Sequence, residues 1–141
     1  MIVVYICFYG TLAALVGSVI HLGQLSIHGS LQGEQWASLL HFNRPLTRGE
    51  LLYLGQDRCG RRVYAAAVGP YGKMLRQIVY SFLPLWGLPP EKVLLVDVGR
   101  EAGLLASLGC LLRSPRLIYV GLHKNYGRLC RLVSGLAQVE T

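Results

Sequence analysis

Charged side chains are scarce in this sequence. They make up 15% of its 141 residues, whereas about 25% is typical of globular proteins. Hydrophobic residues make up 52%, so the chain can bury a large core, and an intrinsically disordered protein is excluded. Because domains commonly contain about 100–150 residues, the length fits a single domain. The low charge also suggests that another subunit, a partner or a membrane covers part of the surface.

Acidic side chains are the rarer of the two charged kinds. Seven Asp and Glu residues stand against fourteen Lys and Arg residues, which gives a net charge of +7. Eleven of the fourteen cations are arginines, whose planar guanidinium suits phosphate and carboxylate groups. An anionic partner is the functional interpretation, and a bias in genomic base composition is the alternative. Since the cations are scattered and form no basic stripe, nucleic acid is not the expected partner.

The four cysteines lack the spacing of a metal site. No C-x-x-C pair is present and no histidine lies at ligand spacing from a cysteine, so a zinc site is not expected. Cys7, Cys110 and Cys130 lie in apolar segments, where a buried and inert thiol is typical. We therefore predict a cytoplasmic protein with reduced cysteines. No Ser, Cys or Thr nucleophile can be paired with a histidine base, so the sequence predicts no catalytic residue.

The first 33 residues contain no charged side chain, and Glu34 is the first one. An apolar segment of about 20 residues could span a bilayer, so membrane association through residues 1–33 is one alternative. However, residues 2–9 are mostly β-branched or aromatic, whereas residues 12–22 carry Leu and Ala at helical spacing. This change favours a buried strand followed by a packed helix, and membrane contact is not the expected outcome. The basic segment and cleavage site typical of a signal peptide are also missing.

Strand and helix patterns alternate along the chain. Apolar, β-branched segments predict buried strands, and two shorter segments around a turn predict a hairpin. The predicted elements are strands at 2–8, 92–98 and 116–120, hairpin strands at 51–56 and 62–68, and helices at 11–22, 34–42, 74–82, 101–112 and 123–137. This order predicts an α/β fold in which residues 1–141 form a single three-layer domain. We expect a mostly parallel sheet with helices on both faces and an added β-hairpin, of Rossmann-like or P-loop-like type.

The carboxyl ends of the strands are the expected binding site, because ligands of open α/β sheets bind there. This rule selects the loops 9–11, 69–73, 98–101 and 121–125. Glycines before a helix start leave backbone N–H groups accessible to an anion, and nearby cations add to this attraction. The candidate ligand-binding residues are Gly10, Thr11, Gly72, Lys73, Asp97, Arg100, His123 and Lys124. The pattern G-x-x-x-x-G-K-[ST] is absent, which excludes a Walker A loop.

Each candidate also has a purely structural interpretation. The segment 69–73 can be a plain turn between a strand and a helix. Asp97, near the end of a buried strand, can hold a metal or a ribose hydroxyl, but it can also pair with Arg100. His123 can act as a general base or contact an anion, or it can face solvent at a helix start.

Several segments resemble a known family. Residues 5–11 (Tyr-Ile-Cys-Phe-Tyr-Gly-Thr) and 20–23 (Ile-His-Leu-Gly) resemble the opening of a small Firmicutes family, domain of unknown function 3189. Residues 52–55 (Leu-Tyr-Leu-Gly) and 94–97 (Leu-Leu-Val-Asp) are similar to it as well, so the likeness covers nearly the whole chain. The family has no established activity, and the resemblance therefore implies a fold and a bacterial origin.

The family's opening motif, Tyr-His-Cys-Tyr-Gly-Gly-Thr-His-Ser-Ser, is degenerate in this chain. Gly10 and Thr11 carry over, with Cys7 beside them. The family's two histidines, first glycine and two serines fall on Ile6, Leu12, Tyr9, Ala13 and Ala14. These replacements leave few groups able to move protons, so the resemblance weakens an enzymatic interpretation.

The leading functional prediction is a protein with little or no catalysis that binds a small phosphate-bearing or nucleotide-like ligand. The sequence identifies neither a cofactor nor a substrate. The alternative is an interaction module or homo-oligomer that associates through apolar surface near Phe82 and Trp86, in a segment where prolines prevent a long helix.

Overall fold

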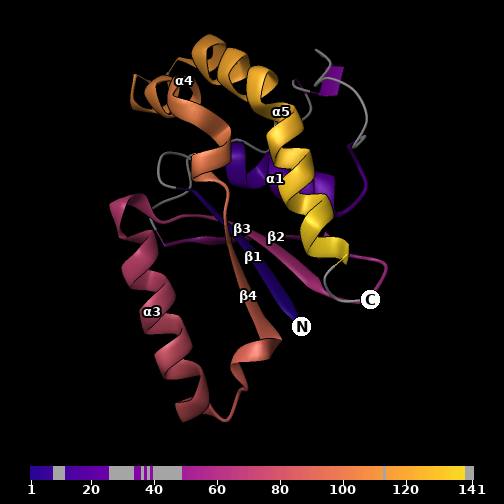
Figure 1. The fold of residues 1–141 in the computed structure, drawn as a ribbon, viewed down its shortest axis with the longest axis vertical. Coiled ribbons are helices and arrows are strands. Elements are labelled where there is room, and N and C mark those ends of the chain that lie inside the picture. Colours follow the sequence, from indigo (N-terminus) through magenta and orange to yellow (C-terminus); the bar gives the residue numbers. More distant parts are fainter. Residues whose placement is uncertain are drawn as a thin grey trace.

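The computed structural model describes residues 1–7, 12–25, 49–112 and 114–138, together with residues 34, 35, 37 and 39. The predicted helix at 34–42 and the loop at 9–11 therefore lie largely or wholly outside the described residues. In chain order the elements are β1 (Ile2–Cys7), α1 (Leu12–His21), β2 (Leu51–Gln56), β3 (Arg62–Ala67), α3 (Gly72–Phe82), β4 (Val93–Asp97), α4 (Gly99–Leu111) and α5 (Pro115–Gln138) (Figure 1). Short 3-10 helices occupy Gly69–Tyr71, Leu83–Trp86 and Pro90–Lys92.

The described strands form one four-stranded sheet in the order β2-β3-β1-β4. β1 pairs in parallel with both β3 and β4, whereas β2 pairs antiparallel to β3. The α/β class and the hairpin are thus confirmed, but the sheet is mixed rather than mostly parallel. In the register, Cys7 lies opposite Ala67, and Ile6 lies opposite Asp97. The carboxyl ends of β1, β3 and β4 therefore meet at one edge of the sheet.

Helices cover both faces of the sheet, because successive side chains of a strand point to opposite sides. Val3 and Tyr5 of β1 pack in a core with residues of α1, α4 and α5. Val4 and Ile6 point the other way, into a smaller cluster against which Val79 of α3 packs. Figure 1 shows α3 on one side of the strands and α1 with α5 on the other. Because β1 is buried on both faces, apolar and polar residues do not alternate along it.

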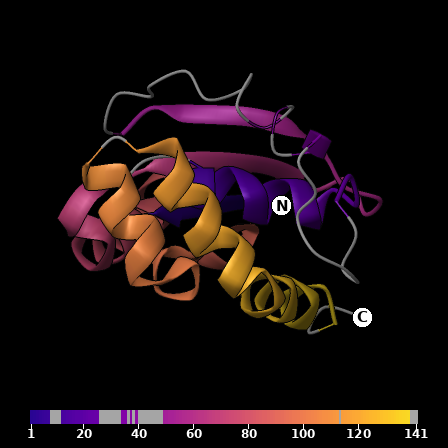
Figure 2. The ribbon, with the colours of Figure 1, turned by 90° about the horizontal axis from the view of Figure 1, so that it is seen from above.

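The predicted strand at 116–120 is wrong. These residues form the first turns of α5, a single helix that also contains the predicted loop at 121–125. Buried side chains recur at helical spacing along it, among them Ile118, Leu122 and Leu129. Figure 2 shows α5 lying beside α4. A Cβ atom added at Gly121 would overlap the backbone of Ala106, so the two helices pack with their backbones in close approach.

The α4 helix is broken at Gly103, where φ is +83° and ψ is 169°. The side-chain amide of Asn125 on α5 donates hydrogen bonds to the carbonyl oxygens of Ala102, at 3.2 Å, and of Gly121, at 2.9 Å. A left-handed φ favours glycine, and a Cβ added at Gly103 would lie 2.5 Å from the Asn125 amide nitrogen. The break in α4 therefore requires glycine at position 103. Asn125 therefore ties the broken helix to α5.

The charge-free opening segment forms a strand and a helix, β1 and α1, as the change in its residue types predicts. Every residue of α1 from Leu12 to Ile20 is buried, which accounts for the absence of charge there. In the part of the chain that the structure describes, no helix combines the length and the hydrophobicity needed to cross a membrane.

Candidate functional site

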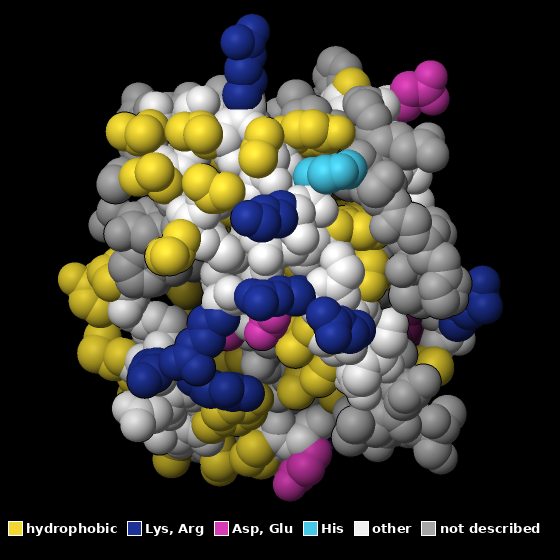
Figure 3. Space-filling view, turned by 45° about the horizontal axis from the view of Figure 1, so that its top comes forward, with side chains coloured by type: hydrophobic (Ala, Val, Ile, Leu, Met, Phe, Trp, Pro, Cys, Tyr) yellow, Lys and Arg dark blue, Asp and Glu magenta, His cyan; other side chains and the backbone are white. Residues whose placement is uncertain are grey.

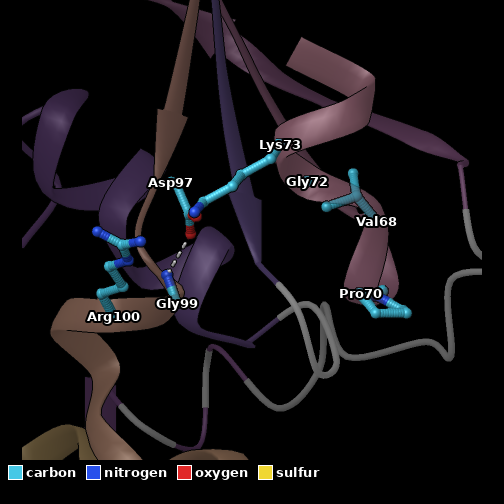
Figure 4. A pocket seen from close by; sticks show the side chains of 8 residues that line it. Val68, Pro70, Gly72, Lys73, Asp97, Gly99 and Arg100 are labelled. Carbon is cyan, nitrogen blue, oxygen red and sulfur yellow. Dashed lines mark hydrogen bonds between the residues drawn. The ribbon is translucent and has the colours of Figure 1, made fainter. Parts of the chain in front are cut away.

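A cavity of about 320 Å³ lies at the carboxyl ends of the parallel strands. Its size falls within the range of about 300–1,000 Å³ that is common for ligand pockets. The start of α3 forms one side, and the end of β4 with the start of α4 forms the other (Figure 4). Its described lining residues are Val68, Gly69, Pro70, Gly72, Lys73, Asp97, Gly99 and Arg100.

Backbone hydrogen bonds to β1 hold both sides of this cavity. The N–H of Val68 donates to the Cys7 carbonyl oxygen, and the N–H of Val98 donates to the Ile6 carbonyl oxygen, each at 3.0 Å. The Asp97 carboxylate then accepts the N–H of Gly99 at 2.9 Å, which turns the chain from β4 into α4. Since both connections are anchored to the same central strand, the sheet fixes their separation.

Three exposed charged side chains line the cavity. Lys73 lies in the first turn of α3, Arg100 lies in the first turn of α4, and Asp97 ends β4. Lys73 extends toward Asp97, and Arg100 lies on the opposite side of the carboxylate (Figure 4). Among the described residues, neither cation forms an ion pair within 4.0 Å. Two positive charges and one negative charge leave the cavity with a net charge of +1, which favours an anion.

The N-terminus of α3 adds to this preference. Its N-cap residue is Tyr71, and no described side chain forms a capping hydrogen bond there. The first N–H groups of a helix have no partner within the helix and carry partial positive charge. An anion in the cavity would accept hydrogen bonds from these groups while Lys73 balances its charge.

The structure brings together four of the eight predicted site residues, namely Gly72, Lys73, Asp97 and Arg100. Gly10 and Thr11 lie outside the described residues. His123 and Lys124 are not in a loop at the strand ends, because the predicted loop at 121–125 belongs to α5; both are exposed on that helix. The His123 ring stacks on Tyr119, with ring centroids 5.6 Å apart. The placement of His123 and Lys124 in the cavity was therefore wrong.

A second cavity, of about 400 Å³, lies between α4 and α5. Glu101 of α4 and Arg128, Arg131 and Leu132 of α5 line it. The sequence prediction missed this group, because it expected binding only at strand ends. The one available signal was the spacing of Arg128 and Arg131, since residues three apart share a helix face.

A buried polar cluster lies near the hairpin turn, at the amino end of β1. The Tyr5 hydroxyl is 2.7 Å from Nδ1 of His21, and Nε2 of His21 is 2.9 Å from an Asp57 carboxylate oxygen. Arg61 donates to the same carboxylate from its side chain and from its backbone N–H. The sequence assigned no role to His21. Here it links α1 and β1 to the hairpin.

The pKa values in this cluster show its structural character. Burial raises the pKa of Tyr5 well above its usual range, so its hydroxyl stays protonated. Burial alone would also raise the pKa of Asp57, but hydrogen bonds from His21, Arg61 and the N–H of Cys59 hold it well below its usual range. Tyr5 is fully buried, and the side chains of His21 and Asp57 are 3% and 7% exposed, so most of this cluster is closed to solvent.

Two further groups lie in the packed interface of α5. Burial raises the pKa of Cys130, and it raises the pKa of Tyr126 well above its usual range. Cys7 and Cys130 are both buried, as predicted, whereas the Cys110 side chain lies outside the described residues.

Comparison with known proteins identifies a family. Residues 2–137 match the model of a family described as "Protein of unknown function (DUF3189)". Neither a curated protein nor a solved structure matches the chain.

Proposed function

The chain belongs to the DUF3189 family, and from its own geometry we propose that it binds a small phosphate-bearing ligand in the cavity between the starts of α3 and α4, with little or no catalysis. The observation that carries this proposal is the convergence of Lys73 and Arg100. They come from different helices, and both line a cavity at the start of α3, where no described side chain caps the helix.

Each group around the cavity has a distinct role toward a phosphate. The N–H groups at the start of α3 donate to its oxygens, and Lys73 supplies a compact positive charge. Arg100 presents a planar fork that matches two phosphate oxygens. One Asp97 oxygen already accepts the Gly99 N–H, so the other oxygen is left to accept a hydroxyl of the ligand.

The same lining argues against catalysis. Among the described lining residues, the titratable side chains are Lys73, Asp97 and Arg100, and none is a Ser, Cys, Thr or His. A general base paired with a nucleophile is therefore missing from the described part of the lining.

Thermal denaturation with a panel of sugar phosphates and nucleotides tests the proposal. A ligand at about 100 times its dissociation constant is expected to stabilise the folded state by about 2.7 kcal/mol. The double variant Lys73→Ala/Arg100→Ala should lose this stabilisation. The matched control is Lys92→Ala/Arg58→Ala, which removes the same charge at exposed positions outside the cavity lining.

The proposal fails if no member of the panel stabilises the protein. It also fails if the control variant loses binding to the same extent as the cavity variant, because the effect would then come from net charge alone.

A second candidate function is self-association through α3. Met74, Ile78 and Phe82 are exposed at intervals of four residues along this helix. Leu85 and Trp86, in the following 3-10 helix, are 75% and 72% exposed. Such a continuous apolar stripe is unusual on a monomer and would be buried by the same stripe of a second copy. Light scattering at high protein concentration tests this, and a strict monomer would contradict it.

A further inference from the structure

The second cavity, between α4 and α5, has the chemistry of an anion site. Arg128 and Arg131 are three residues apart on α5, so both side chains extend from one face of the helix. Arg131 Nε donates to the Gly127 carbonyl oxygen at 3.3 Å, which orients its guanidinium. Within the described ranges, Glu101 forms no ion pair with either arginine at 4.0 Å or less. Two arginines against one glutamate give this cavity a net charge of +1.

The two cavities are neighbours at the start of α4. Arg100 lines the first cavity, and the next residue, Glu101, lines the second. Figure 3 shows Lys and Arg side chains gathered across the centre and lower left of one face, with acidic groups between them. The two cavities share no described lining residue, so we treat them as two separate sites for an anionic group.

We infer that the ligand is a bisphosphorylated small molecule, with one phosphate in the cavity of Lys73 and Arg100 and the other in the cavity of Arg128 and Arg131. This inference rests on the proposed function. Paired guanidinium groups bind phosphate oxygens through charge-assisted hydrogen bonds. Glu101 lines the second cavity next in sequence to Arg100, and its carboxylate can accept hydroxyl groups of a ligand. The connecting part is therefore a polyol, as in a sugar bisphosphate.

Calorimetric titration of the full chain with fructose 6-phosphate and fructose 1,6-bisphosphate tests the inference. We expect the bisphosphate to bind about tenfold more tightly, because it gains a second set of charge-assisted hydrogen bonds. In Arg128→Ala/Arg131→Ala this gain should disappear, so that the two sugars bind with about the same affinity. In Arg128→Lys/Arg131→Lys, which retains the charge but loses the planar fork, part of the gain should remain.

The control variant is Arg58→Ala/Arg116→Ala, which removes two exposed arginines from outside both cavity linings. It should bind both sugars as the native protein does. All of these arginines are exposed, so the variants are expected to fold, which circular dichroism verifies.

The outcomes separate the inference from the proposed function. If the monophosphate binds through Lys73 and Arg100 but the bisphosphate binds no more tightly, the inference fails and the proposed function stands. If neither sugar binds and the wider phosphate panel is also inactive, the proposed function fails. A short single-stranded RNA that binds more tightly than the bisphosphate, through the same arginines, would overturn the small-molecule class.

Discussion

Replacing Asp57 by asparagine should destabilise the protein strongly, although the residue lies in a hairpin turn. The side chain is only 7% exposed. Its carboxylate accepts hydrogen bonds from His21, from the backbone N–H groups of Cys59 and Arg61, and from the Arg61 side chain. Asparagine keeps one oxygen but replaces the other with an NH₂ group, which cannot accept from these donors.

The size of the expected destabilisation follows from the burial of the side chains that contact Asp57. The Arg61 side chain is 12% exposed and the His21 side chain is 3% exposed, so neither recovers full hydration when the charge is removed. Removing one partner of a buried pair costs about 3–5 kcal/mol. For a domain of this size each kcal/mol lowers the melting temperature by about 3 °C, so we expect a decrease of about 9–15 °C.

The effect should depend on pH in a defined direction. The pKa of Asp57 is lower in the folded than in the unfolded state, so the unfolded state binds more protons in acid. This contribution is complete above the usual Asp pKa of about 4 and is lost as pH falls below it. The difference in free energy of unfolding between native protein and Asp57→Asn should therefore narrow as the pH falls.

Urea denaturation at a series of pH values measures this difference. The matched control is Asp97→Asn, because Asp97 also accepts the N–H of the residue two positions later, at the same 2.9 Å, but is exposed. Asp97→Asn should lower the free energy of unfolding by less than about 1 kcal/mol. The reasoning is refuted if Asp57→Asn lowers the free energy of unfolding by no more than Asp97→Asn does. It is also refuted if the difference in that free energy between native protein and Asp57→Asn does not change with pH.

Two further predictions concern the packing of α4 on α5. Gly121→Ala should lower the free energy of unfolding by about 1–3 kcal/mol through overpacking. Gly127→Ala lies in the same helix with nothing within 4 Å of the added atom, so it should raise the free energy of unfolding by about 0.5–1 kcal/mol. Urea denaturation of the two variants measures both changes. Equal effects would contradict close packing at Gly121. Asn125→Ala should lower the free energy of unfolding by about 1–2 kcal/mol, because it removes the hydrogen bonds to the Ala102 and Gly121 carbonyl oxygens. Amide hydrogen exchange measures the effect, and unchanged protection of the α4 amides would contradict it.

Much of the cavity could be predicted from local sequence. Residues 93–97 are apolar up to Asp97, and residues 69–73 combine Gly, Pro and Lys before a helical pattern. Each pattern defines where one strand ends, and the rule for parallel strands places those ends together. Lys73, Asp97 and Arg100 could thus be assigned to one site without knowledge of any contact between them.

The error at residues 116–120 shows where this reasoning stops. Five consecutive residues that include Leu117, Ile118 and Val120 fit either a buried strand or one turn of a buried helix. Helix α5 is favoured because Gly109 and Gly121 let it approach α4, and glycines so far apart along the chain form no local pattern. The same error led to the wrong prediction that His123 lies in a loop at the strand ends, whereas it lies within α5.

Local patterns of apolar residues, glycines and prolines were enough to specify most strands, the hairpin and the residues at the strand ends, because these features depend on neighbours along the chain. Tertiary structure alone decided that α5 is one long helix, that Arg128 and Arg131 line one cavity with Glu101, and that His21 joins Tyr5 to Asp57. Each of these depends on contacts between segments that are distant in sequence. The energies of such contacts cannot be deduced from the local pattern of residues.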